Sequence, residues 1–95
     1  MDRERLMVAE TVRASISGDG LVLLDVEGGV LFASNMVGAR IWQLIEQRRS
    51  RVEIASRIAA NYEIPLERAR NDVVAFIGSL VDRGLVFEQT QGAQC

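Results

Sequence analysis

The stretch GGVLFASNMVGARIW, residues 28–42, passes from a short strand-like run into a helix-like run with only Ser34 and Asn35 between them. Residues 30–33 are apolar and follow a glycine pair that suits a tight turn. Either Ser34 or Asn35 suits the start of a helix, because its side-chain oxygen can accept a hydrogen bond from the first turn. The stretch therefore predicts a strand that leads directly into a helix. This strand must pair with another strand to form a sheet.

Two further strands are predicted on the N-terminal side of this stretch. Residues 11–17 alternate apolar and polar side chains, as in a half-buried strand. Residues 21–26 are apolar on both faces, which favours the middle of a sheet. Glycine-containing turns at residues 18–20 and 27–29 separate the runs. We therefore expect an antiparallel meander whose first and third strands each keep a free edge.

Two helices are expected to follow the meander closely. The first, residues 36–46, carries Gly38 one turn before Trp42. Because a glycine inside a helix costs about 1 kcal/mol relative to alanine, we expect both residues to pack closely against the sheet. The second helix begins at the S-x-x-E capping box of Ser50 and Glu53 and runs toward residue 62.

A third helix is predicted over residues 65–83. Pro65 suits a first helical turn, and Gly84 suits the position after the last one. Val74 and Val81 lie beside the core stripe, so the helix has more apolar surface than one core face uses. The core stripe itself comprises Ala69, Val73, Phe76, Ile77 and Leu80.

The composition indicates a single small globular domain. The chain has 95 residues, of which 48% are hydrophobic and 25% charged, and its formal net charge is −2. Such values are typical of ordered proteins. We expect a domain over residues 11–87, between a flexible lead-in at residues 1–10 and a flexible tail at residues 88–95. The predicted fold is α+β and winged-helix-like, with an N-terminal three-stranded antiparallel sheet followed by a three-helix bundle.

Residue types that catalysis and metal binding commonly need are absent. There is no histidine, so the commonest general base and metal ligand is missing. The glycines lack the spacing of a phosphate-binding loop, and the single cysteine, Cys95, has no partner for a disulfide. We therefore expect no enzymatic activity, no cofactor and no metal site. The lack of a signal peptide or membrane-spanning run favours the cytoplasm.

Four motifs occur in order along residues 21–86 and together resemble one family. They are VLLD…GG before the third strand, N-x-x-G-A-x-I-W-x-L from Asn35, S-x-x-E-I-A from Ser50, and D-V-x-x-F-I-x-x-L-x-x-x-G-L-V from Asp72. This set resembles the PqqD-like family, or RiPP recognition elements, small winged-helix-like domains that bind leader peptides of ribosomally made, modified peptides. Ser34 departs from the leucine that the family often has there, which concerns a packing position. The GARIW form is closer to the stand-alone proteins of lasso-peptide pathways.

The resemblance implies a peptide-binding edge and a role as a peptide chaperone. In the family, the leader peptide adds as an antiparallel strand to the third strand and lies against the third helix. The chain would present the precursor to a processing enzyme, such as a leader peptidase or a radical-SAM enzyme, without chemistry of its own. The implied peptide-binding residues are Val30, Leu31, Phe32, Ala33, Arg70, Val74, Ile77 and Val81.

Two alternatives stay open. A winged-helix DNA-binding module would place Arg68, Arg70 and Asn71 at the reading end of the third helix, although the acidic net charge argues against a nucleic-acid partner. A free strand edge could instead join two copies into a homodimer. Neither a nucleic acid nor a membrane is expected as a partner. The sequence leaves open the precursor, the enzyme and the choice between a PQQ and a lasso-peptide pathway.

Overall fold

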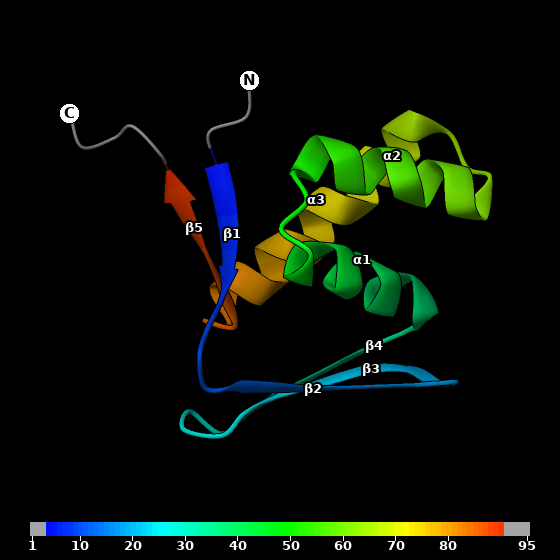
Figure 1. Ribbon diagram of the computed structural model, residues 1–95. Helices are drawn as coiled ribbons and strands as arrows, with labels where there is room; N and C mark the ends of the chain where they lie inside the picture. The colour runs from blue at the N-terminus through cyan, green and yellow to red at the C-terminus, as the bar shows by residue number, and fades with distance from the viewer. Residues whose placement is uncertain (1–3, 91–95) are drawn as a thin grey trace.

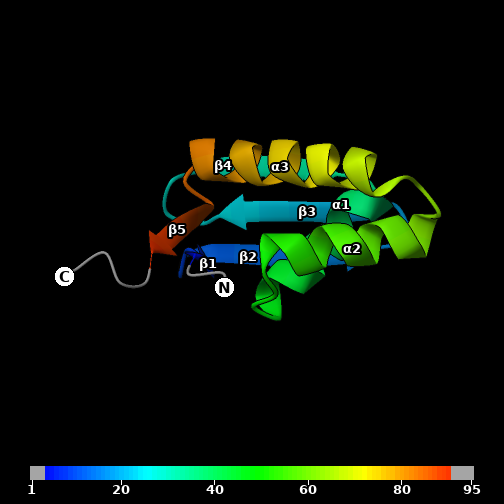
Figure 2. The ribbon, with the colours of Figure 1, turned by 90° about the horizontal axis from the view of Figure 1, so that it is seen from above.

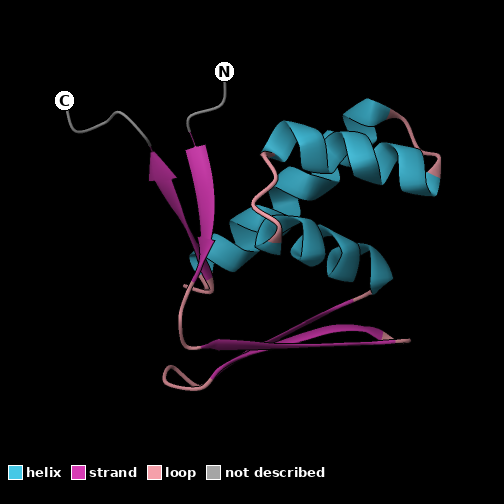
Figure 3. Ribbon diagram, in the orientation of Figure 1, coloured by secondary structure: helices cyan, strands magenta, loops and turns pink. Residues whose placement is uncertain are grey.

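The computed structural model describes residues 4–90 and contains two small sheets and three helices (Figures 1 and 3). The strands are β1 (Glu4–Val8), β2 (Val12–Ser17), β3 (Gly20–Asp25), β4 (Val30–Ser34) and β5 (Val86–Thr90). The helices are α1 (Met36–Glu46), α2 (Arg51–Tyr62) and α3 (Leu66–Asp82). The predicted α+β fold, an antiparallel three-stranded sheet followed by three helices, is confirmed.

The pairing of β1 with β5 is the main difference from the sequence prediction. Residues 1–10 were expected to be a flexible lead-in and residues 88–95 a tail, but Val8 lies opposite Val86, and the antiparallel ladder extends to Thr90. The side chain of Leu6 is buried in the core. The two strands come from opposite ends of the chain, so a local pattern cannot reveal their pairing. Residues 1–3 and 91–95, which include Cys95, lie outside the described residues.

The three-stranded sheet forms one layer and the helices lie over one of its faces, while the β1–β5 ribbon stands at one end (Figure 1). Leu21 and Leu23 of β3 turn toward the helices and are fully buried. Trp42 of α1 is 1% exposed and is a core residue, as predicted. No helix among the described residues is long and apolar enough to cross a membrane.

α1 begins directly after β4 because Asn35 caps it. The Asn35 side chain accepts a hydrogen bond from the Gly38 N–H, 3.0 Å away. A side chain at Gly38 would collide with Ser34 at the end of β4 and would lie 2.8 Å from Cε1 of Phe76 in α3. The predicted close packing at Gly38 is therefore present, and it involves α3 as well as the end of the sheet.

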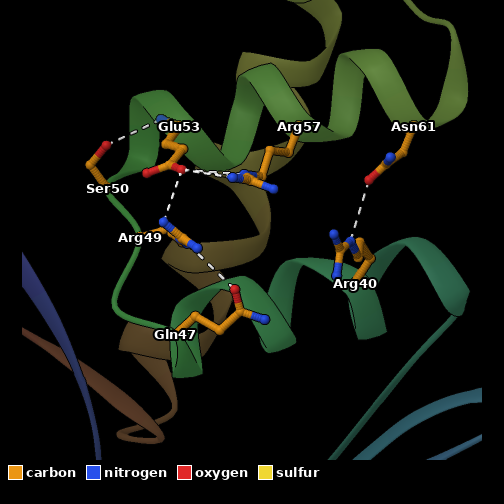
Figure 4. Close-up of polar contacts among 7 residues, drawn as sticks. All are labelled: Arg40, Gln47, Arg49, Ser50, Glu53, Arg57 and Asn61. Carbon is orange, nitrogen blue, oxygen red and sulfur yellow. Dashed lines mark hydrogen bonds and ion pairs between the residues drawn. The ribbon is translucent and has the colours of Figure 1, made fainter.

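The connection from α1 to α2 carries a small polar network (Figure 4). Ser50 caps α2 by accepting a hydrogen bond from the Glu53 N–H at 3.1 Å. The Glu53 carboxylate accepts hydrogen bonds from Arg49 and Arg57, each at 3.2 Å. Exposed ion pairs of this kind contribute at most about 1 kcal/mol. Glu53 therefore ties Arg49, before α2, and Arg57, one turn further along α2, to the first turn of the helix.

Asp25 fixes the turn that leads into β4. Its Oδ1 atom accepts hydrogen bonds from the Thr11 hydroxyl at 2.8 Å and from the N–H groups of Glu27 and Gly28 at 3.1 Å. The Gly28 N–H, followed by the Thr11 hydroxyl and the Glu27 N–H, holds the pKa of Asp25 below its ordinary value. The ionised carboxylate therefore ties the β3–β4 turn to the start of β2.

We expect Gly38→Ala to lower the free energy of unfolding by about 1 kcal/mol. The alanine gains about 1 kcal/mol in helix propensity, but overpacking against Ser34 and Phe76 costs about 1–3 kcal/mol. The matched control is Gly78→Ala in α3, where an added Cβ meets nothing within 4 Å and should stabilise the protein. Urea denaturation measures both. Equal stabilisation by the two substitutions would contradict the close packing at Gly38.

We expect Asp25→Asn to destabilise the protein at neutral pH but not in acid. Because the folded-state pKa is lowered, ionised Asp25 stabilises the fold above its unfolded-state pKa, and this contribution disappears as the pH falls through the folded-state pKa. Urea denaturation at about pH 7 and about pH 2 should show the two proteins converging in acid. A constant difference at both pH values would show that the charge plays no part.

Candidate functional site

β4 lies at the edge of the three-stranded sheet. The strand order is β2-β3-β4, so among residues 4–90 β4 pairs with β3 alone. An edge strand presents unpaired N–H and C=O groups that another extended chain can bond. The expectation of a free edge on this strand is confirmed.

The register shows which residues of β4 face that edge. The Val26 N–H donates a hydrogen bond to the Thr11 carbonyl at 3.1 Å, so the backbone of Val26 points toward the β2 side. Successive residues of an antiparallel strand point their backbone groups to opposite sides. In the β3–β4 pairing, Phe32 is therefore bonded to β3, whereas Leu31 and Ala33 direct their N–H and C=O groups outward.

A hollow of about 490 Å³ lies beside this edge, between the end of β4, the start of α1 and one face of α3. We call it the β4–α3 groove. On the side of β4 and α1 it is lined by Ser34, Asn35, Val37, Gly38 and Ile41. On the side of α3 it is lined by Arg68, Asp72, Ala75, Phe76 and Ser79. Half of these lining residues are polar or charged, so the groove is mixed in character and can contact both apolar and polar groups of a ligand.

Phe32 connects β4 to α3 at the groove. Its ring meets that of Phe76 edge to face, with centroids 5.7 Å apart and an interplanar angle of 75°. The Arg83 guanidinium carbon lies 5.3 Å from the centroid of the Phe32 ring, which is a cation–π contact. In Figure 2, which looks from the helix side, α3 lies directly over β4. These side chains hold the helix and the edge strand at a fixed separation.

The predicted peptide-binding residues do not all come together. Leu31 and Ala33 are exposed at the edge of β4, with Val30 and Phe32 half-buried beside them. Ile77 is 1% exposed and belongs to the core. Arg70 and Val74 line a different hollow, between α2 and α3. Val81 is exposed, seven residues after Val74 and so on the same face of α3. Peptide binding by Arg70, Val74 and Val81 stays untested, and the structure does not place them on the wall that faces β4.

Sequence reasoning missed that wall. Arg68, Asp72, Ala75 and Ser79 follow one another at the spacing of a single helix face. Their small or charged side chains resemble an ordinary solvent-exposed surface, so the polarity pattern gave no signal. The spacing was available, but nothing in the sequence tells which flank of the core stripe lies toward β4.

The chemistry of the groove suits binding. Arg68 Nε lies 3.9 Å from Asp72 Oδ2 on the exposed rim, so the groove offers one charge of each sign. Among the described residues, no cluster of three or more carboxylate, histidine or cysteine side chains could hold a metal ion. Outward backbone groups, the apolar side chains of Val37, Ile41 and Phe76, and a charged rim are kinds of contact that an extended peptide can use.

Comparisons with known proteins identify the family of this chain and structures with a similar fold. The family model described as coenzyme PQQ synthesis protein D (PqqD) matches residues 20–86. The structure of TbiB1 in complex with the TbiA(beta) leader peptide superposes with a TM-score of 0.78, at 29% sequence identity over 84% of this chain and 93% of that chain. No curated protein sequence matches significantly.

A second solved structure shares the fold. Lasso peptide synthetase B1 complexed with the leader peptide superposes with a TM-score of 0.78, at 24% identity over 86% of this chain and 96% of that chain. The family match extends from the first residue of β3 to the first residue of β5 and covers more than half of the chain. The chain therefore belongs to the PqqD family, as its ordered motifs predict.

Proposed function

We propose that this protein binds the leader segment of a ribosomally made precursor peptide by strand addition to β4 and presents it to a processing enzyme. The observation that carries the proposal is the free edge of β4, with Leu31 and Ala33 directed outward beside the β4–α3 groove. The likeness to TbiB1, which is solved with a leader peptide, supports it. The protein acts by holding the peptide and contributes no bond-breaking step.

The edge and the groove must act together. Two outward residues offer four backbone groups, and hydrogen bonds at about 1 kcal/mol each supply about 4 kcal/mol. A micromolar complex needs about 8 kcal/mol. Two apolar side chains of the peptide, each worth about 1.5–3 kcal/mol when buried, supply the difference. We therefore expect the bound segment to be extended and to alternate apolar side chains that enter the groove with polar ones that face solvent.

The pathway is proposed to be of the lasso-peptide type, with a leader peptidase as the enzyme and a radical-SAM enzyme as the alternative. The GARIW sequence at the start of α1 supports this subdivision. In this chain the motif includes Gly38, which packs closely against its neighbours, and it forms part of one wall of the β4–α3 groove.

The DNA-binding alternative receives no support from the arrangement of α3. Arg68 lies on the face toward β4, next to Asp72, whereas Arg70 lies on the face toward α2. A reading helix needs its basic side chains on one surface. The arginines of α3 do not form such a stripe.

We expect Leu31→Pro to weaken leader binding by about tenfold or more. Proline removes one outward N–H and its ring obstructs an incoming strand, and a tenfold loss corresponds to about 1.4 kcal/mol. The ladder with β3 should survive, because the Leu31 N–H does not bond β3. Isothermal titration with a synthetic leader, encoded beside this gene, measures the effect.

The matched control for Leu31→Pro is Ala14→Pro on the opposite edge. By the same register, Ala14 of β2 also directs its N–H away from β3. Ala14→Pro should leave the leader affinity within about twofold, because β2 is not the proposed binding edge. Equal losses from both substitutions, or no loss from Leu31→Pro, would refute strand addition at β4.

Two adjacent residues of α3 test which wall holds the peptide. Ala75 lines the β4–α3 groove and Val74 lies on the face toward α2. We expect Ala75→Arg to fill the groove and reduce leader affinity at least tenfold, and Val74→Arg to leave it unchanged. Both positions are exposed, so the fold should tolerate either substitution. The reverse pattern, in the same titration, would return the site to Arg70, Val74 and Val81.

A further inference from the structure

We propose that a second hollow, between α2 and α3, is the surface that docks the processing enzyme. This inference rests on the proposed function but concerns a different part of the molecule. The hollow has a volume of about 190 Å³ and is lined by Arg51, Val52, Ala55, Arg70, Val73 and Val74. We call it the α2–α3 hollow.

The hollow is an apolar cup with an exposed rim. Val52 is 66% exposed and Val74 is 61% exposed, which is high for aliphatic side chains on rigid helices. Beneath them, Ala55 and Val73 are fully buried and form the floor. An aliphatic side chain of a partner that entered the cup would cover all of this surface. Apolar pockets with exposed walls mark interaction sites more often than isolated exposed residues do.

The charge at the rim specifies the chemistry of the partner. Among the residues that the structure describes, the charged ones that line the hollow are both arginines, Arg51 and Arg70. Arg51 is paired with Glu88 of β5, which fixes the position of its side chain. Among the side chains that the structure describes, at residues 6–88, none forms an ion pair with Arg70. Because guanidinium groups bind carboxylates in a fixed, two-pronged geometry, the complementary surface carries a large apolar side chain next to a carboxylate.

The position of the hollow allows the leader and the enzyme to bind together. Figure 2 shows α3 over β4 and α2 beside α3, on the side toward β2. The β4–α3 groove and the α2–α3 hollow therefore lie on different faces of α3. A carrier without chemistry of its own needs such a second surface, which stays accessible while the leader occupies the first. A strand bound along β4 does not reach Val74.

The inference also explains the surplus apolar surface of α3. Val74 and Val81 lie beside the core stripe and are not needed to pack the domain, because Ala69, Val73, Ile77 and Leu80 already fill the core. Exposed valines in a helix carry no benefit for stability, since β-branched residues have lower helix propensity than alanine. A partner docked in the α2–α3 hollow would cover Val74, whereas Val81 lies outside the lining of the hollow.

The test measures binding of the chain to the processing enzyme encoded beside it, with and without the leader peptide, by biolayer interferometry. We expect Val74→Glu to weaken enzyme binding at least tenfold while the leader affinity, from titration, stays within twofold. Arg70→Glu should weaken enzyme binding similarly and reverse the effect of salt at this contact, because added salt would then screen a repulsion from the complementary carboxylate and no longer an attraction. Circular dichroism checks the fold of each variant.

The control is Val22→Glu, which places the same charge on the outer face of the sheet, where Val22 is 43% exposed. It should leave enzyme binding unchanged. Loss of enzyme binding in Val22→Glu but not in Val74→Glu would overturn the inference, as would unchanged binding in both Val74→Glu and Arg70→Glu. Failure of the wild-type chain to bind the leader would overturn the proposed function instead, and the enzyme measurement without leader would still decide the role of the α2–α3 hollow.

Discussion

The missing side chain at Gly38 is the constraint on which the arrangement of this protein depends. It allows the first turn of α1 to lie against Ser34 of β4 and against the ring of Phe76 in α3. Phe76, which belongs to α3, in turn meets Phe32 of β4 edge to face. One aromatic ring of the last helix therefore contacts both the strand β4 and the helix that follows it. A helix held over an edge strand by side chains, and not by backbone pairing, leaves space beside that edge. The same contacts that stabilise the fold therefore define the groove.

Much of this arrangement could be predicted from local sequence. The apolar run over β3 indicated a central strand, Asn35 and Ser50 provided helix caps, and Gly84 follows the end of α3. These signals depend on residues that are close together in the chain. The β1–β5 ribbon could not be predicted in this way, because its pairing depends on residues from opposite ends of the domain. Alternation of Leu6 and Val8 was present in the sequence, but it gave no indication of a partner strand.

The candidate site shows the same limit at the level of a single helix. Four of the five residues predicted for the core stripe of α3 are buried, while Phe76 is half-buried and lines the groove. The stripe leaves two flanks, one with Arg70, Val74 and Val81 and the other with Ala75 and Ser79. The family resemblance, supported by the surplus apolar surface of Val74 and Val81, favoured the first flank as the peptide-binding wall. In the structure the second flank faces β4. The packing of α3 against α2 and against the β4–α1 junction sets this orientation of the helix. Periodicity shows which face of a helix is buried, but only tertiary packing shows what lies beside it.

The two flanks of α3 suit different kinds of partner, and this difference follows from their chemistry. The flank toward β4 has small and charged side chains next to outward backbone groups, so most of its specificity comes from the shape of an extended chain and its alternate side chains. The flank toward α2 has no free backbone, and its aliphatic side chains and arginines require a complementary folded surface. A flexible peptide loses conformational entropy on binding and is best held by the ordered row of hydrogen bonds at a strand edge, whereas a folded enzyme has already lost that entropy and can be held by a few apolar and ionic contacts. One rigid helix between the two surfaces keeps the peptide and the enzyme in a fixed relation, which is the physical requirement for a protein that brings them together.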